Sequence, residues 1–404
     1  MTNDLEQAQA DRGKDWRSLW SLDPEVIFLN HGSFGACPTA VLEKQTSWRL
    51  QMEQEPVRFF ALELEGLLDA ARQDLSVFVG ADPADLAFVA NATTGVNTVL
   101  RSLCHTFAPG DELLTTDHEY NASRNALDFA AQLSGATVVV AEVPFPIRAP
   151  EQAIEAVLSR VSTRTRLVLL DHITSQTGLV FPLQPLIQQL TAAGIEVLID
   201  GAHAPGMIPL NLRELGATYY TGNCHKWLSA PKGSAFLYIQ SDRQDQLRPL
   251  AISHGANSPR CDRSRFWLEF DWTGTTDPTP YLCVPEAIRW MGSLLPGGWA
   301  ALMRHNRETA LSVRKALCQT LDIEPPCPDS MMAAMAVVPL PNGCASRLQA
   351  DLFSQHHIEV PVNAWHGLSN RLIRVSAQLY NTQSDYDGLI KALLALLAEE
   401  ERNV

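Results

Sequence analysis

Short apolar runs, rich in β-branched residues, alternate with stretches of helical periodicity through the middle of the chain. The runs cover residues 86–89, 112–115, 136–140, 167–170, 196–199, 219–221 and 234–239. Helices are predicted between them, for example at residues 95–104, 123–133, 150–161 and 183–193. Continuous apolar strands that alternate with helices are typical of a mostly parallel sheet covered on both faces. The pattern therefore predicts an α/β domain built on a mostly parallel, seven-stranded sheet.

The pattern changes on both sides of this domain. Residues from about Glu43 to Leu75 are predicted to be helical, with an apolar stripe at helical spacing from Leu62 to Leu75, and Pro56 is expected to break the stretch into two helices. After Pro285 the expected elements are helices at 285–295, 299–321, 345–356 and 384–400 and strands at 332–338, 358–362 and 371–376. We therefore expect a large domain at 46–285 and a smaller α+β domain at 286–404, to which the N-terminal segment 1–45 contributes.

Composition and charge exclude several classes of function. Apolar residues make up 46% of the 404 residues, and the formal net charge at pH 7 is −14. Without a basic run, neither nucleic acid nor an anionic membrane surface is an expected partner, and no apolar segment approaches the roughly 20 residues of a membrane span. The 8 cysteines are scattered and form no metal-ligand spacing. They predict reduced thiols in a cytoplasmic protein and no zinc site.

The strongest candidate for chemistry is Lys226, which lies between His225 and Trp227 just after an apolar run. Most lysines are solvated surface charges. A buried lysine, however, has a lowered pKa and becomes a nucleophile that can form a Schiff base. Asp200 ends an earlier apolar run and is followed by His203. An acid at the end of a buried strand has one of three roles: it caps a helix, binds a metal or pairs with a protonated pyridine nitrogen.

The Asp-x-x-His motif followed by His-Lys resembles the class V aminotransferase family, whose members bind pyridoxal 5′-phosphate (PLP) and have fold type I. The resemblance implies that Lys226 carries PLP and that Asp200 keeps the ring nitrogen protonated. It also implies that His203 bonds the phenolic oxygen of the ring, with Asn223 and His225 close to the cofactor. The absence of a G-x-G-x-x-G motif argues against a nicotinamide cofactor.

Further family landmarks follow in order. Residues 91–97 (NATTGVN) come after a strand and open a helix, so Thr93 and Thr94 are either ordinary helix-capping residues or part of a phosphate site. The resemblance favours the phosphate site. It also implies that Tyr120 stacks on the ring, where the alternative is a half-buried core aromatic, and that Ser175 lies near the cofactor.

Two landmarks concern the partner subunit and the substrate. Thr275 belongs to a Thr-Gly-Thr segment that resembles the part reaching the phosphate of the neighbouring subunit, which implies a homodimer with shared active sites. Without the resemblance this segment is a plain turn. Arg374, on a predicted strand, matches the arginine that holds the substrate carboxylate bidentately. The alternative role of Arg374 is that of a surface arginine in an ion pair.

Residues 30–35 (NHGSFG) and 55–60 (EPVRFF) resemble the isopenicillin N epimerase-like branch of the family. The resemblance implies that the first segment closes over the substrate and brings Asn30, His31 and Ser33 to it. Arg58 is a candidate for a distal substrate carboxylate, or a solvated helix arginine. Residues 360–371 contain no cysteine, which disfavours the persulfide chemistry of cysteine desulfurases.

The expected function is therefore PLP-dependent chemistry at the α-carbon of an amino acid, of the epimerase type. The alternatives are a C–S lyase acting on a cysteine conjugate, an aminotransferase and, outside catalysis, a PLP-binding protein without activity. Epimerisation needs a second proton donor across the ring from Lys226, and His31 and Tyr120 are the two candidates.

Overall fold

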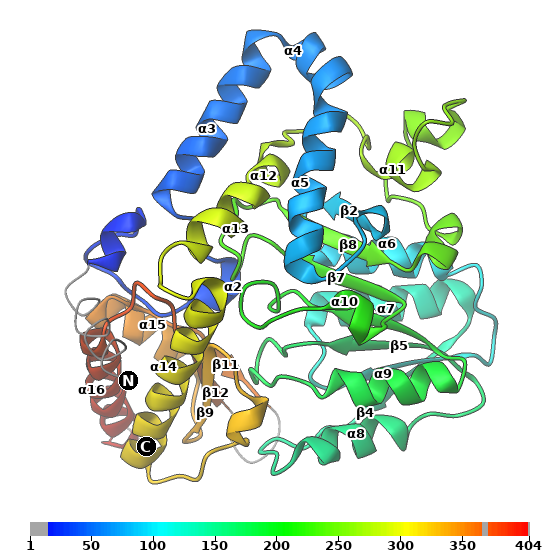
Figure 1. Ribbon diagram of the computed structural model, residues 1–404. Coiled ribbons are helices and arrows are strands. Elements are labelled where there is room, and N and C mark those ends of the chain that lie inside the picture. Colours follow the sequence, from blue (N-terminus) through cyan, green and yellow to red (C-terminus); the bar gives the residue numbers. More distant parts are fainter. Residues whose placement is uncertain (1–14, 366–370, 403–404) are drawn as a thin grey trace.

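A seven-stranded sheet forms the centre of the molecule in the computed structural model, which describes residues 15–365 and 371–402 (Figure 1). Its order is β2-β8-β7-β6-β5-β3-β4, and β8 is antiparallel to both neighbours while the other neighbouring pairs are parallel. The predicted α/β class and mostly parallel sheet are confirmed. The strands are β2 (Leu86–Val89), β3 (Glu112–Thr116), β4 (Thr137–Ala141), β5 (Thr165–Asp171), β6 (Glu196–Asp200), β7 (Tyr219–Asn223) and β8 (Ala235–Ile239).

Helices cover both faces of this sheet because successive strand residues point to opposite sides. In β5, Leu167 and Leu169 pack in the same buried cluster as residues of α6 and α7, whereas Val168 and Leu170 pack with residues of α8 and α9. The continuous apolar runs of the sequence have this origin. The covering helices are α6 (Ala92–Leu103), α7 (Asn121–Ser134), α8 (Pro150–Leu158) and α9 (Leu183–Ala192).

The C-terminal part contains a three-stranded antiparallel sheet of order β11-β12-β9. The predicted strand at 358–362 is wrong as one element, because it is interrupted around Pro361, which has no N–H for a sheet ladder. Its first half pairs in parallel with the N-terminal strand. The elements are β1 (Ile27–Phe28), β9 (Met335–Leu340), β10 (Ile358–Glu359), β11 (Val362–Ala364), β12 (Arg371–Ser376), α13 (Val284–Gly292), α14 (Gly298–Leu321), α15 (Ala345–His356) and α16 (Gln383–Arg402).

The pairing of β1 with β10 ties the N-terminal segment to the C-terminal part. That residues 1–45 contribute to a small domain stays a prediction. Residues 1–14 of that segment lie outside the described residues. The boundaries at 45 and 285 stay a prediction.

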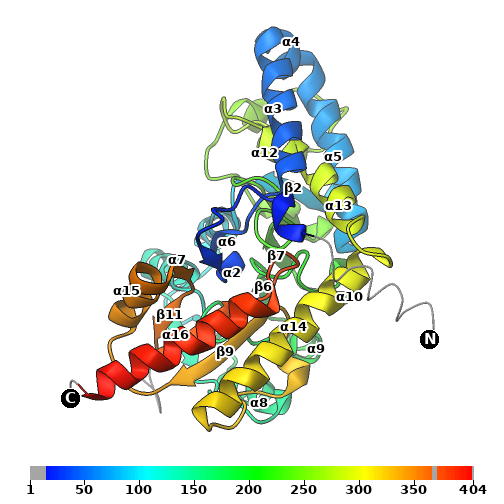
Figure 2. The same cartoon turned by 90° about the vertical axis from the view of Figure 1, so that its left-hand side faces the viewer.

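Two helices form an arm that rises above the sheet and turns at α4 (Figures 1 and 2). Pro56 begins α4 and breaks the helical stretch as predicted, because proline is tolerated in a first helical turn but not in an interior. Within the described ranges, no helix is both long and apolar enough to cross a membrane. The arm and the short helices are α3 (Thr39–Gln54), α4 (Pro56–Arg58), α5 (Leu64–Val79), α2 (His31–Phe34), α10 (Leu212–Leu215), α11 (Arg265–Phe270) and α12 (Thr279–Leu282).

Candidate active site

A cavity of about 300 Å³ opens where the carboxyl ends of β5, β6 and β7 meet the first turn of α6. Ligands of parallel sheets bind at this end, because the loops and helix N-termini there leave polar groups free. The cavity brings together most of the cofactor residues expected from the sequence. The expected residues in its lining are Ser33, Thr93, Tyr120, Ser175, Asp200, His203, Asn223, His225 and Lys226.

Lys226 follows β7 and reaches into the cavity with its amine 3.3 Å from Nε2 of His203. Burial and the positive charge of Arg374 lower the pKa of Lys226 to about 8, although the carboxylates of Asp200 and Asp171 oppose the shift. Burial and the charge of Lys226 also lower the pKa of His203 well below its ordinary value, so this imidazole is neutral. A lysine in this state has far more free amine near neutral pH than an ordinary lysine, as a nucleophile requires.

Asp200 ends β6 with both carboxylate oxygens bonded. Oδ2 accepts a hydrogen bond from Oγ of Ser123 at 2.7 Å, and Oδ1 accepts one from the N–H of Ala202 at 3.0 Å. Burial raises the pKa of Asp200, and these hydrogen bonds oppose the shift by favouring the charged form. The two donors fix the carboxylate in the cavity wall, where it can hold a protonated ring nitrogen.

The first turn of α6 forms another wall of the cavity, with Asn91, Ala92 and Thr93 in the lining. Asn91 caps the helix, because its Oδ1 accepts the N–H of Thr94 at 2.8 Å. Asn223 in β7 accepts the N–H of Ala92 at 2.8 Å, so its side chain ties the helix to the strand that leads to Lys226. The N-terminus of a helix is suited to an anion such as phosphate.

Arg374 extends from β12 and is buried. One terminal nitrogen of the guanidinium donates to the backbone oxygen of Ser175 at 2.6 Å and to its hydroxyl at 3.2 Å. The other terminal nitrogen donates to the hydroxyl of Ser33 at 2.9 Å and to Oδ1 of Asn30 at 3.4 Å. Burial lowers the pKa of Arg374 to about 10, so the group stays positively charged at neutral pH. Among the described residues no carboxylate pairs with it, and a buried charge without a counterion points to an anionic ligand.

His31 has a different environment from the one expected for a substrate contact. Its Nε2 lies 3.0 Å from the backbone oxygen of Lys226, and its Nδ1 lies 2.9 Å from the hydroxyl of Tyr380. Because the backbone oxygen only accepts, Nε2–H donates to it and Nδ1 accepts from Tyr380. Burial lowers the pKa of His31 to about 3. With both nitrogens engaged, the neutral ring supports the lysine backbone and has no free donor for a substrate.

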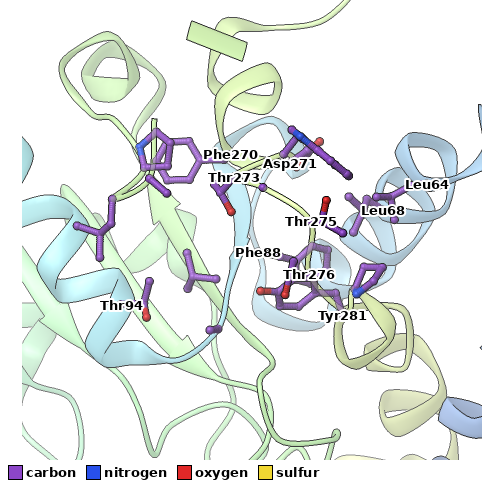
Figure 3. Close-up of a pocket in the computed structure, with 18 of the residues that line it drawn as sticks. Leu64, Leu68, Phe88, Thr94, Phe270, Asp271, Thr273, Thr275, Thr276 and Tyr281 are labelled. Carbon is purple, nitrogen blue, oxygen red and sulfur yellow. The ribbon is translucent and has the colours of Figure 1, made fainter. Parts of the chain in front are cut away.

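Thr94, Thr275 and Arg58 are not among the residues that line the Lys226 cavity in this chain. Thr94 and Thr275 line a second cavity of about 320 Å³, between α6 and the segment after α11 (Figure 3). Arg58 lies on the arm, where its side chain is 60% exposed and pairs with Glu63 at 2.7 Å. Neither Thr275 nor Arg58 therefore lines the Lys226 cavity of its own chain.

Sequence reasoning missed Asp171, which lines the cavity, and Ser123, which holds Asp200. Asp171 and Asp200 end neighbouring strands and face each other in register. The signal for Asp171 was present, because it is an acid at the end of a buried run. The signal for Ser123 was weak, since a serine in the first turn of a helix is common.

The model of the family described as "Aminotransferase class-V" matches residues 37–389. The chain belongs to this family. It is 35% identical over 393 residues to the isopenicillin N epimerase of Amycolatopsis lactamdurans, which covers 94% of this chain and 97% of that protein. It is 29% identical over 413 residues to an L-cysteine desulfhydrase of Arabidopsis thaliana, which covers 93% of this chain and 88% of that protein.

A solved structure of the protein C-DES, a lysine-to-alanine variant with glycine covalently linked to its PLP cofactor, has the same fold. The two structures share a TM-score of 0.77 and 22% sequence identity, and the match covers 93% of this chain and 98% of that one. The cofactor of the family is PLP, and the cavity of this chain fits it. Its buried amine, its fixed carboxylate and a helix N-terminus are three polar features suited to the aldehyde, the pyridine nitrogen and the phosphate. Nδ1 of His203 is also buried there, without a partner among the described residues.

Proposed function

We propose that this chain is a PLP-dependent epimerase that inverts the α-carbon of an amino acid. The observation that carries the proposal is the buried guanidinium of Arg374, which has no counterion among the described residues and lies beside the cavity of Lys226. A charge of this kind binds the substrate carboxylate and thereby fixes the direction of the bond from the α-carbon to its hydrogen.

Four residues are proposed to bind the cofactor in the Lys226 cavity. Lys226 holds it covalently through its amine, Asp200 accepts a hydrogen bond from the protonated ring nitrogen, and the first turn of α6 with Thr93 binds the phosphate. PLP, when bound, supplies an electron sink for negative charge at the α-carbon. His203, neutral and 3.3 Å from the amine of Lys226, contacts the phenolic oxygen of the ring in this proposal.

Inversion needs proton transfer at two faces of the α-carbon. Lys226 moves the proton on one face, since its amine becomes free when substrate displaces it and its pKa is lowered to about 8. Tyr120 is the candidate for the other face, because it lines the cavity from the loop between β3 and α7. This loop follows β3, and in the sheet β5 and β6 separate β3 from β7, the strand that leads to Lys226. Since both nitrogens of His31 are engaged, we assign the second donor to Tyr120.

A second candidate is β-elimination from a cysteine derivative, favoured by the likeness to the Arabidopsis L-cysteine desulfhydrase. The same groups of the chain would remove the α-proton, and the two reactions diverge afterwards. Loss of a sulfur leaving group then replaces reprotonation.

One screen in D₂O separates the candidates. The holoenzyme is given D- and L-amino acids and cysteine conjugates, and inversion, deuterium at the α-carbon and pyruvate release are scored separately. The epimerase proposal predicts inversion with one solvent deuterium and no pyruvate. Pyruvate without inversion would establish the lyase. Lys226→Ala should lose either activity, and turnover in this variant would contradict the proposal.

The proposed holoenzyme is a cytoplasmic homodimer. Phe34 lines the Lys226 cavity but is 72% exposed, and Leu250 and Ile252 near the second cavity are 47% and 63% exposed. A second copy would cover these apolar side chains and bring a neighbouring Thr275 to the phosphate. The eight cysteines are free thiols, which suits a reducing compartment. Sedimentation equilibrium tests the dimer, and a monomer with full activity would contradict it.

A further inference from the structure

Three carboxylates, those of the buried Asp171 and Asp200 and of the half-buried Glu119, converge beside the Lys226 cavity. Glu119, Asp171 and Asp200 each place one oxygen within 4.8 Å of the other two. Asp171 and Asp200 are register partners at the ends of β5 and β6, and Glu119 lies in the loop before α7. Of the three, only Asp200 has a role in the proposed function, so the other two acids need an explanation.

The hydrogen bonds of the three carboxylates are unequal. Both oxygens of Asp200 accept hydrogen bonds. Glu119 accepts one from the hydroxyl of Thr115 at 3.2 Å. Its Oε1 and the Oδ2 of Asp171 are buried and have no hydrogen-bond partner within the described part of the chain. Buried oxygens are seldom left without a donor, and the O–H of an unionised carboxyl is such a donor.

Charge balance points to the same conclusion. Within residues 15–365 and 371–402, no cation forms an ion pair with any of the three carboxylates. Burial and mutual repulsion raise the pKa of Glu119 and of Asp171 well above the ordinary values. Three full negative charges in this small volume are therefore unfavourable. The ionisable groups that face the cluster from the surrounding elements are Arg124 in α7, Tyr220 in β7 and Lys226 after β7.

We propose that Glu119 and Asp171 share one proton, so that the pair carries a single negative charge behind Asp200. The proton resides on one of these two carboxyls, each of which has an oxygen within 4.8 Å of an oxygen of the other. The remaining charge adds to that of Asp200 and favours the protonated forms of the cofactor nitrogens. Glu119 and Asp171 are therefore positioning residues, and the inference rests on the proposed binding of the cofactor nitrogen by Asp200.

The test is a pH titration of the visible absorption band of the holoenzyme in Glu119→Gln, Asp171→Asn and the double variant. If one proton is shared, either single variant leaves the other acid to carry the same single charge, and the midpoint of the band stays where it is in the wild type. The double variant removes that charge and lowers the midpoint by about one pH unit. The matched control is Glu112→Gln, which removes a buried carboxylate at the opposite end of β3 and should leave the midpoint unchanged.

Three outcomes overturn the proposal. Equal shifts in the single variants that add in the double variant would mean that both acids are ionised. No shift in any variant would mean that the pair has no charge acting on the cofactor. A wild-type midpoint that moves on addition of EDTA would show a bound cation in place of the proton.

A second measurement uses only the wild-type protein and so does not depend on the folding of any variant. The infrared spectrum of the wild-type holoenzyme at neutral pH should contain the C=O stretch of a protonated buried carboxyl, and its absence would also overturn the proposal. Failure of the proposed function gives a different result, since the wild-type protein would then form no visible band with PLP at all.

Discussion

Arg374→Met is expected to remove substrate binding without destabilising the fold. Among the described residues, the guanidinium donates hydrogen bonds only to neutral groups, those of Ser175, Ser33 and Asn30. Burying a charge without a counterion costs hydration energy, and these neutral hydrogen bonds offset only part of that cost. Methionine has a similar length and no charge, so the substitution removes the hydration cost together with the bonds. We expect the free energy of unfolding to change by about 1 kcal/mol or less.

The effect on activity follows from the two hydrogen bonds that a guanidinium makes to a carboxylate. A hydrogen bond to a charged group is worth about 1.5–3 kcal/mol. Loss of both bonds therefore costs about 3–6 kcal/mol, which corresponds to a decrease of about 10²–10⁴-fold in kcat/KM. The assay measures α-deuterium exchange with the best substrate of the screen, and urea unfolding of the same preparation measures stability.

Arg371 on the same strand is the matched control. It is fully buried like Arg374, but it pairs with Glu400 in α16. Arg371→Met breaks this pair and should destabilise the protein by about 3 kcal/mol while kcat/KM stays near the wild-type value. If Arg374→Met destabilises the protein by as much as the control and retains its kcat/KM, Arg374 is a structural arginine and the reasoning is refuted.

Three further predictions concern the surroundings of Lys226. A Cβ on Gly35, whose φ is +69°, would lie 2.2 Å from the backbone oxygen of His225. Gly35→Ala should therefore lower the thermal midpoint of the protein and weaken its visible absorption band. In the control variant Gly66→Ala the new Cβ meets nothing within 4 Å, so neither quantity should change. Ser123→Ala removes a donor to Asp200 and should weaken PLP binding to the apoprotein by about 10- to 100-fold, measured by fluorescence titration; unchanged affinity would contradict the role of this bond. Because Lys226 reacts only as the free amine, PLP attachment to the apoprotein should accelerate by about tenfold per pH unit and level off above its pKa of about 8. An increase that continues past pH 10 would show an ordinary, solvated lysine.

The sheet was predictable because its strands are buried on both faces and appear as continuous apolar runs. Strand β12 begins and ends where the sequence predicts. The short strand β10 was not predictable, because a pairing with β1 across most of the chain leaves no local pattern. The pairing of β10 with β1 depends on where the N-terminal segment packs.

The site was predictable where one short motif contains the chemistry. Lys226, His203 and Asp200 stand out because they follow strands, and the structure places all three in one cavity. Glu119 and Asp171 were not singled out, since their approach to Asp200 depends on β5 lying between β6 and β3. That order is a property of the folded sheet and not of any segment. The engagement of the two His31 nitrogens likewise depends on Lys226 and Tyr380, both far along the chain.

The most direct test of the account is the position of the covalent bond between protein and cofactor. The holoenzyme is reduced with borohydride and digested, and the peptides are analysed by mass spectrometry. The account predicts the mass of the reduced cofactor on Lys226. The internal control is Lys232, whose amine donates to the backbone oxygen of Gly35 at 2.6 Å and therefore lies close to the same loop. Labelling of Lys232 or another lysine, with Lys226 unmodified, would contradict the account.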